Sequence, residues 1–121
     1  MESIQQIAVR AAEEMFKTIQ GTGLEDVGKL AKALLPISTK MTIEIIQSCI
    51  EEMDQCLVYA AKAQRQRDDM TVKERAVERA ITTALGDLHY RRTYFALLDG
   101  SYAYILDHLI GVEAYERFSR E

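Results

Sequence analysis

The sequence predicts an α+β fold in which N-terminal helices, one of them long, pack on a three-stranded antiparallel β-meander. Two observations lead to this fold class. Apolar residues recur at helical spacing through the first half of the chain, and after Val77 they alternate with polar residues. The 121 residues, 48% of them hydrophobic, suffice for one domain with a core. We expect a single domain over 1–121, with a helical part at 1–66, a connection at 67–77, the β-meander at 78–106 and a short helix and tail at 107–121.

The first two helices are expected to be short. Apolar residues form a stripe from Ile4 to Ile19, and Gly21 ends that helix. The T-x-x-E spacing that begins at Thr22 is typical of a capping box, so a second helix is expected to begin there. Proline removes a backbone donor, and we therefore expect this second helix to end at Pro36.

The third helix is unusually long, from about residue 38 to residue 65. Its apolar residues recur at alternating intervals of four and three, which is the spacing of a coiled-coil seam. Such a seam can cover the sheet or pair two chains, and we expect it to contribute to a homo-oligomer. The residues expected in that contact are Ile46, Ile50, Met53 and Leu57.

The β-meander is predicted from alternating strands and glycine turns. Gly86-Asp87 is expected to form the first turn, because glycine tolerates the positive φ of a two-residue hairpin loop. A second turn at Asp99-Gly100 leads into a third strand. Asp107 is placed to cap a short C-terminal helix, which Gly111 interrupts. A three-stranded sheet is only marginally stable alone, so we expect the long helix to cover one face.

Arg91 and Arg92 are adjacent on the central strand, so their side chains leave opposite faces of the sheet. We expect the Arg92 face to be inward, which would bury Arg92 against a carboxylate such as Asp107 or Glu116. Arg91 and His89 would then face solvent and be available to phosphate. The Arg92 face also carries Leu88, Tyr90 and Tyr94, and the Arg91 face carries His89, Thr93 and Phe95.

Basic charge is concentrated in the middle of a chain whose net charge is −4. Residues 62–92 contain eight basic and five acidic side chains. Arginines interleaved with aromatic residues, as in the string HYRRTYF, can bind phosphate and stack on bases. Basic residues also suit a helix C-terminus or a solvated sheet face, so both interpretations stay open. The residues expected to contact DNA are Lys62, Arg65, Arg67, Lys73, Arg75, Arg79, His89 and Arg91.

The sequence contains no pattern typical of catalysis or metal binding. Cys49 and Cys56 would lie about 10 Å apart along one helix, too far for a disulfide. His89 and His108 lack paired ligand spacing, so no metal and no cofactor are expected. Without a nucleophile beside a base, a phosphate loop or convergent carboxylates, no enzyme activity is expected. No signal peptide or membrane span is found, which predicts a cytoplasmic protein with no membrane partner.

The run from Arg79 to Ser119 resembles the N-terminal region of the ISLre-type insertion-sequence transposases. The resemblance also extends to the preceding long helix, and it covers roughly residues 43–119. Asp87 stands where that family has glutamate, and Ala114 where proline is common. The positions that carry the resemblance are Arg79, Thr83, Gly86, Arg91, Arg92, Tyr94, Tyr102, Tyr104, Leu106, Asp107, Gly111, Tyr115, Glu116, Arg117 and Ser119.

The resemblance implies that this chain is the noncatalytic N-terminal part of a longer DNA transposase, either a truncated piece or a remnant. The catalytic acidic residues of such a protein lie on an RNase-H-like domain that would follow residue 121. The part represented here would recognise transposon ends, assemble the transposase, or do both. The alternative is a stand-alone homo-oligomeric interaction module that does not bind nucleic acid.

Overall fold

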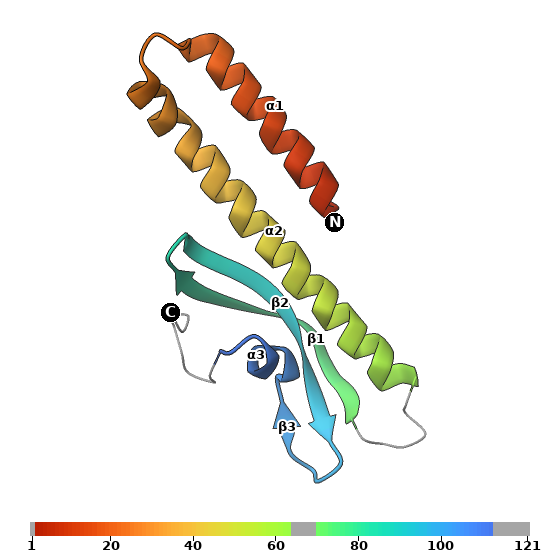
Figure 1. The fold of residues 1–121 in the computed structure, drawn as a ribbon. Helices are drawn as coiled ribbons and strands as arrows, with labels where there is room; N and C mark the ends of the chain where they lie inside the picture. Colours follow the sequence, from red (N-terminus) through yellow and green to blue (C-terminus); the bar gives the residue numbers. More distant parts are fainter. Residues whose placement is uncertain (1, 64–69, 113–121) are drawn as a thin grey trace. The chain divides into compact units, whose positions relative to one another are not determined.

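The computed structural model describes residues 2–63 and 70–112, and it confirms the α+β class (Figure 1). The chain divides into two compact units, Met1–Ser48 and Cys49–Glu121. The elements in order are the helices α1 (Ile4–Thr22) and α2 (Val27–Ala63), the strands β1 (Met70–Thr83), β2 (Gly86–Leu97) and β3 (Tyr102–Ala103), and the short helix α3 (Ile105–Leu109).

The first unit is a helical hairpin made of α1 and the first part of α2. Ser3 caps α1, because its hydroxyl accepts a hydrogen bond from the Gln6 N–H at 3.1 Å. The Gln6 side chain accepts one from the Ser3 N–H at 2.8 Å, which completes a capping box. An ion pair joins Arg10 of α1 to Glu44 of α2. The buried apolar residues include Ile7, Ala11 and Leu30.

A single helix replaces the second and third predicted helices. Helix α2 runs through Pro36 without ending, so the prediction of a helix end there is wrong. Proline removes one helical hydrogen bond, but the long runs of helix on both sides keep theirs and offset that loss. The predicted capping box at Thr22 is also wrong, since Thr22 is the last residue of α1. Instead, the Asp26 carboxylate accepts a hydrogen bond from the Lys29 N–H at 3.1 Å, where α2 begins.

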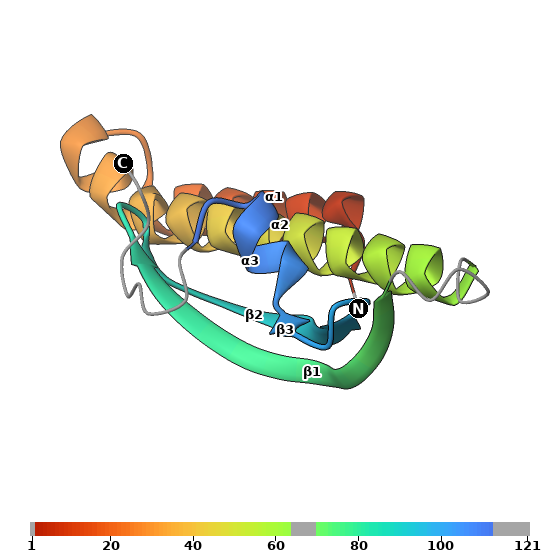
Figure 2. The same ribbon diagram turned by 90° about the horizontal axis from the view of Figure 1, so that it is seen from below.

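The sheet has the order β1-β2-β3, and neighbouring strands are antiparallel. Strand β1 begins at Met70, so residues 70–77 form strand where the sequence predicts a connection. The alternation is hidden there because three exposed charged side chains follow one another in this edge strand, at Lys73, Glu74 and Arg75. Its register with β2 also shifts between Val72 and Glu74 and again between Glu74 and Val77. Such irregularities bend a strand, and Figure 2 shows the bend of β1.

The hairpin turn between β1 and β2 lies at residues 84–85, two residues before the predicted Gly86-Asp87. The Thr83 hydroxyl closes the turn, donating to the Gly86 carbonyl at 2.8 Å and accepting from the Leu85 N–H at 3.1 Å. Gly86 has a φ of 119°, so the conformational freedom of glycine is used at the first residue of β2 rather than inside the turn.

The second turn lies at Asp99-Gly100, as predicted, and Gly100 has a φ of 88°. The strand that follows is limited to Tyr102–Ala103. Helix α3 begins at Ile105, so Asp107 lies inside its first turn and does not cap it. Gly111, with a φ of 78°, follows the end of α3, which agrees with its predicted role as an interruption.

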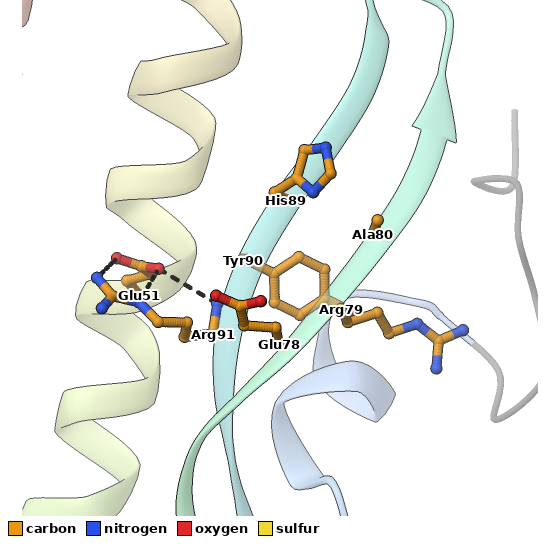
Figure 3. A pocket seen from close by; sticks show the side chains of 7 residues that line it. All are labelled: Glu51, Glu78, Arg79, Ala80, His89, Tyr90 and Arg91. Atoms are coloured by element: carbon orange, nitrogen blue, oxygen red, sulfur yellow. Dashed lines mark hydrogen bonds and ion pairs between the residues drawn. The ribbon is translucent and has the colours of Figure 1, made fainter.

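Helices cover both faces of β2 (Figure 3). Phe95 packs with Val58 and Ala61 of α2 in the main apolar cluster of the second unit. On the opposite face, Arg92 and Tyr90 both bind Asp107 of α3. The long helix therefore covers the part of the Arg91 face that carries Thr93 and Phe95, so the prediction that only the Arg92 face is inward is wrong. Side-chain alternation alone cannot tell which of two covered faces belongs to which helix.

Candidate nucleic-acid interface

Asp107 is the centre of a buried polar network on the α3 face of β2. Its carboxylate accepts a hydrogen bond from the Tyr90 hydroxyl at 2.7 Å. It forms an ion pair with Arg92 and a longer one, at 3.4 Å, with Nη1 of Arg79. Burial, together with the hydrogen bond to Asp107 and the charge of that carboxylate, raises the pKa of Tyr90 above its ordinary value. The network holds two arginines inside the fold.

The predicted burial of Arg92 against Asp107 is confirmed. The alternative partner, Glu116, lies outside the described residues. Arg79, by contrast, does not face outward as a DNA contact would. Its side chain is only 10% exposed and pairs with Asp107, because Arg79 stands opposite Tyr90 in the sheet and shares its face.

Arg91 and His89 face solvent, as predicted, in an open hollow of about 300 Å³ (Figure 3). The Arg91 side chain is 57% exposed. Glu51 of α2 nevertheless holds it, accepting hydrogen bonds from the Arg91 N–H and from its Nε, each at 3.2 Å. Glu78 stands opposite Arg91 in the neighbouring strand. The hydrogen bond to Glu51 and its charge, with a smaller effect of Glu78, raise the pKa of Arg91. A phosphate at Arg91 must therefore compete with Glu51.

Lys73 and Arg75 are exposed on β1, at the part of the strand where regular pairing breaks down. Ala76, beside them, has a φ of 58°, which is uncommon for a residue with a side chain. An irregularity of this kind turns side chains out of the ladder. The structure thus places two exposed cations on the bent part of β1.

The other predicted DNA contacts are placed differently. Lys62 is exposed in the last turn of α2. Arg65 and Arg67 lie outside the described residues. Of the predicted cations whose positions are described, the structure leaves four turned to solvent and removes Arg79 from the group. Those four are Lys62, Lys73, Arg75 and Arg91.

The predicted oligomerisation seam is partly used inside the chain. Ile50 is buried, and Leu57 packs against the apolar cluster of the second unit. Ile46 and Met53 stay exposed. In the second unit, the buried row of α2 begins at Ile50, which the predicted seam shares, and then follows residues one position later than the seam: Asp54, Val58 and Ala61.

Asp54 is a structural anchor that is absent from the predicted residues. It is buried, and its carboxylate accepts hydrogen bonds from the Thr93 N–H at 2.9 Å and from the Thr93 hydroxyl at 2.7 Å. The sequence signal that could have identified Asp54 is its position four residues after Ile50 and four before Val58, which places it in the middle of an apolar row. A carboxylate in such a row needs donors from a partner segment.

Within residues 2–63 and 70–112, no group of three or more histidine, cysteine, aspartate or glutamate side chains could hold a metal ion. Cys49 and Cys56 are free and exposed. Among the helices that the structure describes, none combines the length and the apolar character that a membrane crossing requires.

A family model described as an uncharacterised protein family (UPF0236) matches residues 22–121. The chain belongs to the UPF0236 family. The chain is similar to UPF0236 proteins of Caldanaerobacter subterraneus subsp. tengcongensis. One is 30% identical over 112 residues, which is 92% of this chain and 23% of the relative. A second is 29% identical over 108 residues, which is 88% of this chain and 22% of the relative.

The chain thus spans less than a quarter of the length of these curated UPF0236 relatives. No solved structure matches it. The UPF0236 match includes the whole of α2, the sheet and α3, and therefore both the Asp107 network and the exposed cations of β1.

Proposed function

We propose that this chain is the DNA-recognition and assembly part of a transposase-like protein. The resemblance of Arg79 to Ser119 to the ISLre-type transposases supports this proposal. Catalysis would then belong to the larger portion of the UPF0236 relatives that this chain does not span. No DNA-cleaving activity is expected from the chain alone, with or without magnesium.

The observation that carries the DNA-binding part is the position of Lys73 and Arg75. Both are exposed on the bent stretch of β1, where the strand departs from regular pairing. Charged side chains that leave a strand at a bulge can reach phosphates on either side of a groove, and β-ribbons are known to enter DNA grooves. Phosphate contacts of this kind supply most of the affinity for DNA and make it depend on salt.

Arg91 has a lesser part in this proposal. Glu51 binds its guanidinium, and Glu78 stands opposite it, so the hollow around Arg91 contains two carboxylates. A phosphate would have to displace Glu51 before it could bind Arg91. The outer strand is therefore the better phosphate-binding surface.

Assembly is supported by apolar side chains that stay exposed on the two helices of the first unit and on the loop between them. Large exposed apolar residues that cluster on helices usually mark an interaction surface. We propose that a second copy of the chain covers them, as a complex that holds two DNA ends together would require. The residues concerned are Val9, Phe16, Leu24, Val27, Leu35 and Ile46.

The same apolar residues favour the alternative function, a homo-oligomeric interaction module that does not bind DNA. The two functions differ in one measurable property. Binding of a duplex with a linear dependence of log affinity on log salt is expected only for the first.

The test is a salt series of anisotropy titrations with a labelled 25-base-pair duplex. We expect the variant that carries both Lys73→Gln and Arg75→Gln to flatten the salt slope by about 2, since each phosphate contact contributes roughly 0.9. The matched control removes the same charge from exposed lysines of the first unit, Lys17→Gln with Lys29→Gln, and should keep the wild-type slope.

Two outcomes would contradict the proposal. Failure of the wild-type chain to bind the duplex at low salt would reject DNA recognition and favour the interaction module. A single species of 13.8 kDa in light scattering at tens of micromolar would reject assembly for both functions.

A further inference from the structure

We infer that three stacked tyrosines, Tyr94, Tyr102 and Tyr104, form a platform that binds an unpaired base of single-stranded DNA. This inference rests on the proposed DNA-binding function and names a second binding site within it. The rings lie on the same face of the sheet as Arg92, because Tyr94 is two residues from Arg92 on β2 and Tyr102 pairs with Ala96.

Tyr94 is the middle ring of the stack. Its centroid lies 5.4 Å from that of Tyr102, with 24° between the ring planes. On the other side, its centroid lies 4.6 Å from that of Tyr104, with 33° between the planes. Both separations are within the range in which aromatic rings attract one another. The three rings thus form one continuous column drawn from two strands and the residue before α3.

One end of the column is held in place by the Asp107 network. The Arg92 guanidinium lies 3.7 Å from the ring centroid of Tyr104, in cation–π contact. Asp107 fixes the guanidinium in turn through their ion pair. A site whose parts are already ordered loses less entropy when a ligand binds. The buried network therefore prepares the rings for binding.

The other end of the column is half exposed to solvent, and a lysine lies over its ring. Tyr102 is 50% exposed, and the Lys73 ammonium lies 5.8 Å from its ring centroid. A base that takes the place of the ammonium over Tyr102 would continue the column, and its phosphate would lie within reach of the displaced lysine. An aromatic ring flanked by a cation is the usual arrangement in proteins that bind single strands without regard to sequence.

The charges and the shape both favour DNA over a peptide. The Lys73 ammonium lies at the exposed ring, and along this stretch of β1 the exposed cations Lys73 and Arg75 outnumber the one acid between them, Glu74. An apolar peptide would require a groove, whereas this end of the column is a half-exposed ring. A paired base stacks on its neighbours and cannot offer its face to Tyr102, so the ligand must be unpaired.

The test measures the affinity of the chain for a labelled 15-nucleotide oligothymidylate, for the same backbone without bases and for a 25-base-pair duplex. We expect Tyr102→Ala to weaken oligothymidylate binding about tenfold, and to change duplex binding less than about twofold. Tyr102→Phe should keep the wild-type affinity, because it keeps the ring. The control is Tyr59→Ala, which removes a tyrosine that is 77% exposed on α2 and should change neither affinity.

Lys73→Gln adds a second readout, since it should flatten the salt slope for oligothymidylate by about 0.7. If Tyr102→Ala binds oligothymidylate as the wild type does, or if the wild type binds the baseless strand equally well, the platform is wrong. When duplex binding is retained in that case, the proposed function stands. If the wild type binds none of the three probes, the platform and the DNA-binding function are both wrong.

Discussion

Replacing Arg92 with alanine should destabilise the fold far more than the same replacement at Arg91, its neighbour in the chain. Arg92 is buried, and its guanidinium contacts both Asp107 and the Tyr104 ring. Arg91 is 57% exposed, and its partner Glu51 holds it at the edge of an open hollow. Solvent can replace the lost interaction in the second case only.

The size of the effect follows from what remains around the carboxylate. Removing one partner of a buried ion pair costs about 3–5 kcal/mol. For Arg92→Ala we expect about 3 kcal/mol, because Asp107 keeps the Tyr90 hydroxyl at 2.7 Å and Arg79 at 3.4 Å. For Asp107→Ala we expect about 5 kcal/mol, because Arg92, Arg79 and the Tyr90 hydroxyl all lose the carboxylate that they share inside the fold.

Urea unfolding followed by circular dichroism at pH 7 measures these differences. With a denaturant slope of about 1 kcal/mol per molar urea, Arg92→Ala should lower the midpoint by about 3 M. Arg91→Ala should keep the wild-type midpoint. The total stability of a small domain is about 5–15 kcal/mol, so a loss of this size can leave Arg92→Ala unfolded without urea. Arg92→Lys keeps the charge, and its urea midpoint should lie between those of the wild type and Arg92→Ala. Equal midpoints for Arg91→Ala and Arg92→Ala would refute the assignment of the two faces.

Two further predictions concern the anchors of β2. Asp54→Asn should lower the free energy of unfolding by about 1.5–3 kcal/mol, because it weakens the two hydrogen bonds that Thr93 donates to the carboxylate. The control is Glu52→Gln at an exposed neighbouring position, which should keep the wild-type stability. Equal urea midpoints for the two variants would contradict this prediction. Burial and Asp107 raise the pKa of Tyr90, so its contribution to stability is fully present below the unfolded pKa of about 10 and declines as pH rises from there towards the folded value. Between about pH 9 and 11, wild type and the exposed-site control Tyr59→Phe should therefore lose stability more steeply than Tyr90→Phe, and three parallel curves would count against the mechanism.

Local patterns in the sequence were sufficient for the fold class. A stripe of apolar residues predicts helix, and alternation predicts strand, because the two backbones have periods of 3.6 and 2 residues. The same alternation places Arg91 and Arg92 on opposite faces of β2, where the structure has one exposed and the other buried. Asp99-Gly100 could be located as a turn because its residue types suit one locally.

Local patterns failed where the surroundings outweigh them. Pro36 ends a helix by its own chemistry, yet α2 continues because the turns on both sides keep their hydrogen bonds. The first half of β1 carries exposed charges and a bulge, so its period is not visible in the sequence. Its pairing with β2 decides that it is a strand.

The partners of the charged side chains were decided by tertiary structure. Asp54 meets Thr93 across 39 residues of chain, Glu51 meets Arg91 across 40, and Arg79 meets Asp107 across 28. The sequence determines which face of its own helix or strand each of these residues occupies. Which segment covers that face depends on how distant elements pack, and no local spacing encodes that. For this reason the sequence identified the basic region of the chain, while only the packed structure separated the arginines that hold the fold together from the cations that remain available to a partner.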